Sequence, residues 1–186
     1  MKLYKILNWV IAAILLTSCT AQENQEQLQA DRAIPPPKTI TLDENYQKVM
    51  GQTIYVPVYS HIFHQDEKEV LDLAATLSIR NTDFNHTIAI ASVKYYDWNG
   101  KLVRNYLEQP IEIAALASTD FFVNSSDRSG GSGAKFVVEW VAKTSVSEPI
   151  VETIMISTAF QQGISFVSPG KVIENHHNSQ PKNPNQ

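Results

Sequence analysis

The sequence contains only one cysteine, Cys19, among its 186 residues. No intramolecular disulfide bond can therefore form, and the folded state must depend on its apolar core. Acidic residues outnumber basic residues by 19 to 15, and no basic patch is present, which argues against nucleic acid as a partner. The apolar run Ile6–Leu16 is shorter than the roughly 20 residues that cross a bilayer as a helix.

The N-terminal residues follow the order of a signal peptide. Lys2 and Lys5 form a positive segment, the apolar run Ile6–Leu16 follows, and small residues precede Cys19. Leu16-Thr17-Ser18-Cys19 resembles the bacterial lipobox, in which a signal peptidase cuts before a diacylglyceryl-modified cysteine. We therefore expect residues 1–18 to be a lipoprotein signal peptide, with lipid attached to Cys19. A plain cleaved signal and an uncleaved membrane anchor are the alternatives.

Lipid on Cys19 would make a membrane the first partner of the mature protein and would leave no free thiol. Two or three acyl chains would hold it stably, because each buried methylene contributes about 0.8 kcal/mol. Thr20 stands where aspartate would favour retention in the inner membrane, so we expect the outer membrane in a bacterium with two membranes. Loss of residues 1–18 removes two lysines and no acid, and changes the net charge from −4 to −6.

The remaining chain divides into a tether, one domain and a tail. Residues 19–45 are polar and contain Pro35-Pro36-Pro37, which is typical of a flexible tether with a stiff, extended segment. Residues 46–174 carry the patterns of a folded domain. Residues 175–186 include His176-His177, and we expect them to form a disordered tail.

Strand and turn signals fill residues 46–174. The clearest strand is Leu71–Ile79, where apolar and polar residues alternate. Asn99-Gly100 predicts a hairpin with a type I′ turn, in which both central residues have positive φ. The other expected strands are Gln52–His64, Thr87–Tyr96, Lys101–Leu107, Ile111–Ala115 and Thr119–Val123 (one long strand or a bent pair), Phe136–Ala142, Ile150–Phe160 and Ile164–Val167.

Seven to nine short strands, without a convincing helical period, predict an all-β fold. We expect an antiparallel β-sandwich, immunoglobulin-like in the loose sense, with a small open barrel as the alternative. Phe136–Ala142 and Ile150–Phe160 are expected to form a hairpin. Trp140 is the expected central aromatic residue of the core, with Phe136 and Val138 on the same face.

Four sequence phrases occur in order along the domain: Gly51–His61 (GQTIYVPVYSH), Leu77–Asp83 (LSIRNTD), Ser129–Trp140 (SGGSGAKFVVEW) and Gln162–Phe166 (QGISF). Together they resemble a family of exported bacterial proteins that is known only as a domain of unknown function. The resemblance covers about residues 51–173 and implies a single domain of bacterial origin. It implies no activity, cofactor or site residue.

No motif predicts a phosphate, metal or nucleophile site. The glycine-rich Ser129–Gly133 leads into a strand, not into the Lys-Ser or Lys-Thr and helix of a phosphate-binding loop, so we expect a tight loop in which glycine supplies positive φ. His61 and His64 would lie on opposite faces of a strand, without further ligands at chelating spacing. We therefore expect no cofactor, no metal and no catalytic residue.

The candidate polar site consists of two carboxylates. Asp127 lies beside the glycine-rich segment, and Glu139 lies in the expected strand Phe136–Ala142. A buried carboxyl group with a raised pKa would mark a functional site.

The candidate partner surface consists of Tyr55, Tyr59, His61 and Phe63, which share one face of the strand Gln52–His64. Pro57 lacks a backbone N–H, so we expect this strand at a sheet edge. Aromatic side chains on such an exposed edge are typical of partner recognition.

These observations favour a non-enzymatic, lipid-anchored protein of the cell envelope that binds an envelope protein or a wall component. The reasons are that the lipidated chain has no free thiol, that no residues have metal-ligand spacing, and that no nucleophile motif is present. A hydrolase with a site assembled from distant loops and a carrier of a small ligand are the alternatives.

Overall fold

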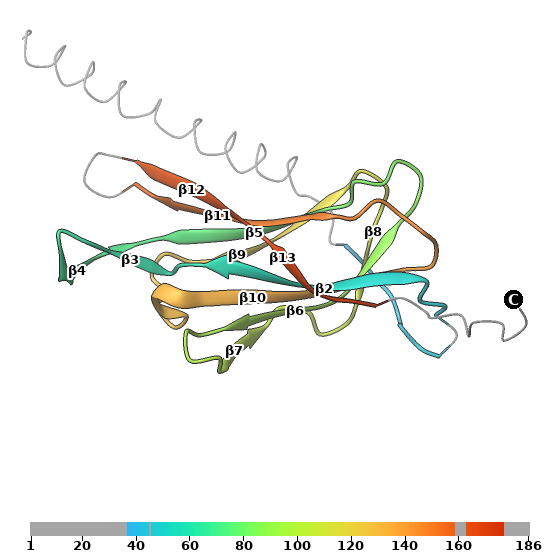
Figure 1. The fold of residues 1–186 in the computed structure, drawn as a ribbon, viewed down its shortest axis with the longest axis horizontal. Helices are drawn as coiled ribbons and strands as arrows, with labels where there is room; N and C mark the ends of the chain where they lie inside the picture. Colours follow the sequence, from blue (N-terminus) through green and yellow to red (C-terminus); the bar gives the residue numbers. More distant parts are fainter. Residues whose placement is uncertain (1–36, 45, 159–162, 177–186) are drawn as a thin grey trace, which may run out of the picture. The chain divides into compact units, whose positions relative to one another are not determined.

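The computed structural model describes residues 37–44, 46–158 and 163–176 (Figure 1). The chain divides into two units, residues 1–36 and 37–186, and every described residue belongs to the second. The predicted signal peptide and Cys19 therefore lie outside the described residues. In the described part, antiparallel strands pack as a sandwich, and no helix is long and apolar enough to cross a membrane. The prediction of an all-β antiparallel sandwich is confirmed.

The first sheet has seven strands, which lie in the order β1-β8-β6-β10-β2-β13, with β7 paired to β6. All of its pairings are antiparallel, and the longest run through β2, β6 and β10. Its strands are β1 (Lys38–Thr39), β2 (Met50–Val58), β6 (Ile88–Tyr96), β7 (Leu102–Asn105), β8 (Ile111–Ile113), β10 (Ala134–Ala142) and β13 (Lys171–Asn175).

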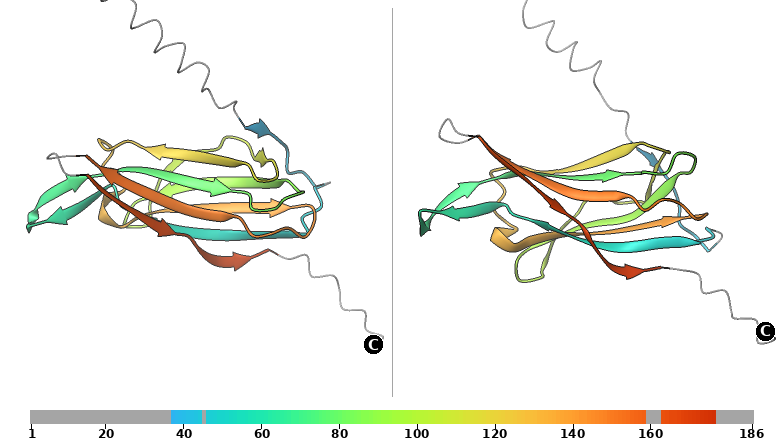
Figure 2. Two further views of the ribbon diagram at one scale, coloured as in Figure 1. Left: turned by 90° about the horizontal axis from the view of Figure 1, so that it is seen from above. Right: turned by 45° about the horizontal axis from the view of Figure 1, so that its top comes forward.

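The second sheet has four strands in the order β12-β11-β5-β9, also antiparallel. Its strands are β5 (Ala74–Arg80), β9 (Ser118–Val123), β11 (Ile150–Ser157) and β12 (Ile164–Pro169). Two further strands, β3 (His61–His64) and β4 (Asp66–Asp72), form a separate hairpin that projects from one end of the sandwich (Figures 1 and 2).

The core lies between the two sheets, where alternate residues of each strand point inward. Trp140 is fully buried together with Phe136 and Val138, so its predicted central position is confirmed. Its indole Nε1 donates a hydrogen bond to Oε1 of buried Gln52 at 3.2 Å. The amide group of Gln52 in turn donates to Oε1 of Glu148 at 2.7 Å. The core therefore satisfies its largest polar aromatic group within the protein.

Two of the connections between the sheets bear on the predicted strand pairs. The prediction that Phe136–Ala142 and Ile150–Phe160 form a hairpin is wrong, because β10 belongs to the first sheet and β11 to the second. Ile111–Ala115 and Thr119–Val123 form the bent pair, since β8 and β9 also lie in different sheets. Leu116 lies at this bend with a φ of 58°.

The hairpin at Asn99-Gly100 exists, but its turn differs from the prediction. The backbone N–H of Asp97 donates to the carbonyl oxygen of Lys101 at 2.9 Å, so three residues form the loop between β6 and β7. Within this loop, only Gly100 has a positive φ, at 82°. This is the geometry of a three-residue hairpin loop that ends in a left-handed glycine, not of a type I′ turn.

The folded domain extends beyond the predicted limits of 46–174 at both ends. β1 lies within the predicted tether, and Ile40 N–H donates to the carbonyl oxygen of Pro110 at 2.8 Å. Asn175 ends β13, and Nε2 of His176 lies 2.8 Å from the hydroxyl oxygen of Thr53. Thirteen strands occur in the described ranges instead of seven to nine, because the expected strand Gln52–His64 divides into β2 and β3 and because β1, β4 and β13 were not predicted as separate strands.

The sandwich has two ends with different contents. At the joining end, the chain enters β1 at Lys38 opposite Glu112 and leaves β13 at Asn175 opposite Gln52, and the loops 81–87, 114–117 and 143–149 lie here. At the far end lie the β3–β4 hairpin, the turn 97–101 and the loop 124–133 (Figures 1 and 2).

Candidate functional site

The β3–β4 hairpin is attached to the far end by a charged pair and by backbone contacts. Arg128 donates from Nε to Oδ1 of Asp72 at 2.6 Å and from Nη2 to Oδ2 at 2.7 Å. This hydrogen-bonded guanidinium group holds the pKa of Asp72 below its usual value. Ser60, which is buried, donates from N and Oγ to the carbonyl oxygen of Gly131 at 3.2 and 3.0 Å. The base of the hairpin is thus fixed by a bidentate pair and by the glycine-rich loop.

The glycine-rich segment supports an exposed tryptophan. Gly130 accepts a hydrogen bond from the backbone N–H of Trp98 at 3.0 Å. A Cβ atom at Gly131 would lie 3.6 Å from Cγ of Trp98, and Gly131 has a φ of 74°. The indole ring therefore lies against the glycine-rich loop, while 67% of the residue is exposed. The segment is a tight loop before a strand, as predicted, with positive φ at Gly131.

Tyr95 lies beneath this loop. The residue is fully buried, and its hydroxyl group has no hydrogen-bond partner within the described ranges. Burial raises the pKa of Tyr95 to about 12. Its ring packs on Phe136, with the ring centroids 5.0 Å apart. The phenol is therefore a component of the packed core.

The four residues of the predicted partner surface do not share one exposed face. Tyr55 is half-buried on the outer face of the first sheet, between Val137 and Lys171 on the neighbouring strands. Tyr59 is half-buried against the core, and its ring centroid lies 6.1 Å from that of Phe166. The predicted edge position of this strand is wrong over Gln52–Tyr55, because β13 pairs with that part of β2.

His61 and Phe63 occupy a different environment on the projecting hairpin. Their rings meet edge to face, with centroids 5.7 Å apart. Phe63 is 54% exposed, so this part of the predicted surface does present an aromatic side chain to solvent. We define the far-end surface as His61, Phe63 and Trp98, which lie at the same end of the sandwich.

The two candidate carboxylates lie apart from each other. Asp127 precedes the glycine-rich loop and accepts hydrogen bonds from N and Oγ of Ser129 at 3.0 and 2.5 Å. It also lies 2.9 Å from Nη2 of Arg104. The Ser129 hydroxyl group is the main cause of the lowered pKa of Asp127. Glu139 lies in mid-β10 on the outer face of the first sheet. Asp127 therefore organises a loop, and a raised pKa is not found there.

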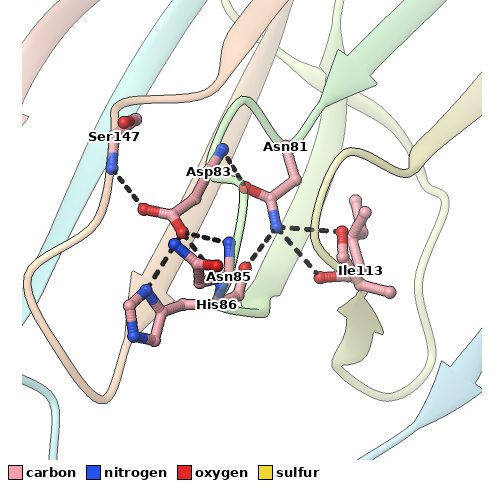
Figure 3. Close-up of polar contacts among 7 residues, drawn as sticks. Asn81, Asp83, Asn85, His86, Ile113 and Ser147 are labelled. Atoms are coloured by element: carbon pink, nitrogen blue, oxygen red, sulfur yellow. Dashed lines mark hydrogen bonds and ion pairs between the residues drawn. The ribbon is translucent and has the colours of Figure 1, made fainter.

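A polar network at the joining end was missed by the sequence analysis (Figure 3). The carboxylate of buried Asp83 accepts hydrogen bonds from the backbone N–H groups of Asn85, His86 and Ser147 at 2.9, 2.9 and 3.0 Å. Nδ1 of His86 lies 3.0 Å from Oδ1 of the same carboxylate. These bonds, first those from Asn85 and Ser147, hold the pKa of Asp83 far below its usual value.

Asn81 extends this network to a third loop. Its Nδ2 donates to the carbonyl oxygens of His86 and Ala114 at 2.8 and 2.9 Å, and lies 3.4 Å from that of Ile113 (Figure 3). Its Oδ1 accepts from the backbone N–H of Asp83 at 3.0 Å. One buried amide and one buried carboxylate thereby join the loops 81–87, 114–117 and 143–149. The phrase LSIRNTD contains both residues, and Asn-x-Asp after a strand is the signal that could have indicated this turn.

The Asp83–His86 pair has two of the three parts of a nucleophilic triad. Ser147 takes part in this network through its backbone N–H, which donates to Asp83. Near the far end, Nδ1 of His61 lies 3.3 Å from Oγ of Ser60, but this hydroxyl group is buried and donates to Gly131. Both sets of residues are held by structural hydrogen bonds in positions unsuited to attack on a substrate.

The described residues contain no cluster of metal-ligating side chains, and a hollow lies on their surface. In the described ranges, no three His, Cys, Asp or Glu side chains are grouped so that they could hold a metal ion. A surface hollow of about 350 Å³ lies beside β11, where its walls mix polar and apolar groups. It is lined by Asp72, Ala74, Ser125, Ile156, Ser157 and Thr158.

Comparisons with known proteins show the family. Residues 51–173 match the family described as "Protein of unknown function (DUF3124)", and the chain belongs to this family. A search of curated proteins finds no match. The structure is similar to one described as "Crystal Structure of Thermotoga maritima 1070", with 12% identity and a TM-score of 0.40, over 64% of this chain and 92% of the other.

Proposed function

We propose that this member of the DUF3124 family is a lipid-anchored module of the bacterial cell envelope that binds a protein partner through its far-end surface. The observation that carries the proposal is the projecting β3–β4 hairpin, which exposes Phe63 at the same end of the sandwich as the exposed Trp98. Aromatic residues of this kind are enriched at protein interfaces, where they supply large contact areas on few rotatable bonds.

Binding accounts for the far end better than catalysis does. The polar groups beside the far-end surface are engaged in structural bonds, Asp72 with Arg128 and Asp127 with Ser129 and Arg104. These bonds make the loop and the base of the hairpin rigid. A rigid, aromatic surface loses little conformational entropy when a partner binds, which favours recognition.

The charge of the hairpin tip favours a basic partner surface. Asp66, Glu67 and Glu69 are exposed around a single lysine, Lys68. Acidic groups at the rim of an aromatic patch attract a protein surface of opposite charge and increase the rate of association. We therefore infer that the partner is an envelope protein with a basic and apolar surface.

The anchor is the second part of the proposal. The lipobox-like Leu16-Thr17-Ser18-Cys19 supports cleavage before Cys19 and lipid attachment to it, with the domain in the periplasm or outside the cell. The outer membrane is the favoured site in a bacterium with two membranes. Attachment restricts the domain to a thin layer, which raises its effective concentration for partners in the same layer.

Replacement of the lipid-bearing cysteine tests the anchor. Cys19→Ala should abolish incorporation of labelled palmitate and should either release the protein from the membrane fraction or leave an uncleaved precursor. The reason is that Cys19 is the only cysteine and therefore the only site for a thioether-linked lipid. Metabolic labelling followed by membrane fractionation measures both effects. Labelled palmitate on the Cys19→Ala protein would contradict the proposal.

Truncation of the exposed hairpin phenylalanine tests the binding surface. Phe63→Ser should lower the amount of protein partner crosslinked in intact cells about fivefold or more, as expected for a hot-spot aromatic residue. The matched control is Phe122→Ser, because Phe122 is equally exposed, at 55%, on the outer face of the second sheet. Both variants should keep their unfolding free energy within about 1 kcal/mol of the parent.

The identity of the crosslinked material decides between partner classes. Equal capture by the parent and Phe63→Ser would remove the far-end surface as the binding site. Capture of wall glycan in place of protein, lost in Phe63→Ser, would keep the surface and overturn the protein partner.

A further inference from the structure

Two bulky apolar side chains stand out at the joining end. Phe84 is 77% exposed and Leu116 is 58% exposed. They lie on adjacent loops, because the backbone N–H of Leu116 donates to the carbonyl oxygen of Asp83 at 3.1 Å. When exposed apolar side chains gather on one part of a surface, they often mark an interaction site.

Hydrogen bonds hold the backbones of the two loops that carry Phe84 and Leu116. The Asp83 carboxylate and the Asn81 amide bind the backbones of both loops, as described above. Leu116 has a φ of 58°, a conformation that is strained for a residue with a branched side chain. The network therefore holds Leu116 in an unfavourable backbone conformation with its side chain in solvent.

The position of this end relative to the N-terminal chain suggests what covers it. β1 pairs with β8, so the chain joins the domain beside Ile113, directly before the bend that carries Leu116. Only 17 residues separate Cys19 from Pro37, and they reach at most about 60 Å when fully extended. Lipid on Cys19 would thus keep the joining end within this distance of a bilayer.

Two ion pairs lie among the charged groups at this end, which lowers the penalty for bringing these four groups to a lipid surface. Nζ of Lys38 lies 3.0 Å from Oε1 of Glu112. Nη2 of Arg80 lies 3.4 Å from Oε1 of Glu152, and Glu148 accepts a hydrogen bond from Gln52.

We propose that the joining end docks on the membrane surface, with Phe84 and Leu116 inserted among the lipid headgroups and upper acyl chains. The proposal rests on the lipid anchor at Cys19 proposed above. Docking in this orientation would turn the β3–β4 hairpin and Trp98 away from the bilayer, towards partners. Docking would thus fix the orientation of the domain on the membrane, with the far-end surface facing the aqueous compartment.

Site-specific spin labels can test this on the complete lipidated protein. Cys19 is the only cysteine, so once acylated it leaves an introduced cysteine as the only free thiol. Phe84→Cys and Leu116→Cys place a nitroxide at the joining end, and Phe63→Cys places a control at the far end with similar exposure. Each protein is reconstituted into vesicles of phosphatidylethanolamine and phosphatidylglycerol, and collisions with dissolved oxygen and with a water-soluble nickel complex are measured.

The expected result is a several-fold higher ratio of oxygen to nickel collisions at Phe84→Cys and Leu116→Cys than at Phe63→Cys. Equal ratios at both ends in vesicle-bound protein would overturn docking and leave the anchor intact. Shielding from both reagents at the joining end would also overturn it, because a protein surface would then cover the site. Protein that fails to float with the vesicles would instead contradict the lipid anchor. Phe84→Cys alone decides the matter if the strained position of Leu116 prevents folding of the second variant.

Discussion

Gly130→Ala should lower the free energy of unfolding by about 3 kcal/mol or more, the upper range for overpacking of a core. Gly130 is buried in an ordinary right-handed conformation, with φ −78° and ψ −27°, so backbone strain is not the reason. The reason is space: an added Cβ atom would overlap the hydroxyl oxygen of Tyr95. The same atom would lie 2.6 Å from Cζ of Tyr95 and 2.7 Å from Cβ of Ala134.

The Tyr95 ring has no room to move away from such a Cβ atom. It is fully buried and packs on Phe136, which itself packs on Tyr106 with ring centroids 5.7 Å apart. Chemical denaturation of the purified protein measures the effect. Gly133→Ala is the matched control, because its Cβ atom would meet only Cβ of Trp98, at 3.5 Å, and this variant should stay close to the parent.

A double substitution identifies the clash. Tyr95→Phe alone should change the unfolding free energy by less than about 1 kcal/mol, since the hydroxyl group makes no hydrogen bond to the described residues. In Gly130→Ala with Tyr95→Phe, part of the lost stability should return, because the worst overlap is removed while the contact to Cζ remains. A Gly130→Ala protein as stable as Gly133→Ala would show that the loop moves freely.

This glycine illustrates which part of the fold can be predicted from sequence. A run of glycines before an apolar strand indicates a tight loop, and Gly131 has the expected positive φ. The need for glycine at position 130 arises from Tyr95, which is 35 residues away in sequence and on another strand. Alternating patterns likewise predicted inward residues such as Trp140, because side-chain period is local. Which strands pair is not local, and so the hairpin expected from Phe136–Ala142 and Ile150–Phe160 was wrong.

In the candidate sites, too, local features were predictable from the sequence and tertiary contacts were not. Pro57 indicated an edge strand, yet β13 covers β2 as far as Tyr55 and stops where the proline begins. The proline was therefore correctly read as an obstacle to pairing, but its effect is confined to the end of the strand. The network of Asn81 and Asp83 was not predicted, because their partners lie on loops that meet through the tertiary fold.

Asn81→Asp should be the most damaging isosteric substitution at the joining end, with a loss of about 3–5 kcal/mol at neutral pH. The side chain is buried, and its Nδ2 donates to the carbonyl oxygens of His86 and Ala114. A carboxylate would place an unpaired negative oxygen against these carbonyl groups, close to the Asp83 carboxylate. Asn105→Asp is the matched control, because Nδ2 of Asn105 donates to the carbonyl oxygen of Leu107 at an exposed position. It should cost less than about 1 kcal/mol.

The pH dependence separates buried charge from lost hydrogen bonds. Burial beside carbonyl groups raises the pKa of the introduced carboxyl group above its unfolded value of about 3.9. Its penalty therefore grows as pH rises above 4 and fades below it, where the protonated group can donate one hydrogen bond. Asp83 acts in the opposite sense, because its pKa is lowered on folding: it stabilises the parent above about pH 4, and this stabilisation is lost as pH falls.

The first trend brings the Asn81→Asp protein closer to the parent in acid, whereas the loss of the Asp83 contribution affects both proteins. Asn81→Ala removes the same donors without adding a charge and should lose about 1–3 kcal/mol with no corresponding recovery at low pH. Denaturation midpoints of the three proteins at neutral pH and near pH 4 measure the difference. If neither Asn81→Asp nor Asn81→Ala lost stability at either pH value, the amide would be unimportant as a donor. The three loops of the joining end would then be held together by the Asp83 carboxylate and by bonds such as that from Oγ1 of Thr82 to the carbonyl oxygen of Glu148, and Leu116 would need another explanation for its strained backbone.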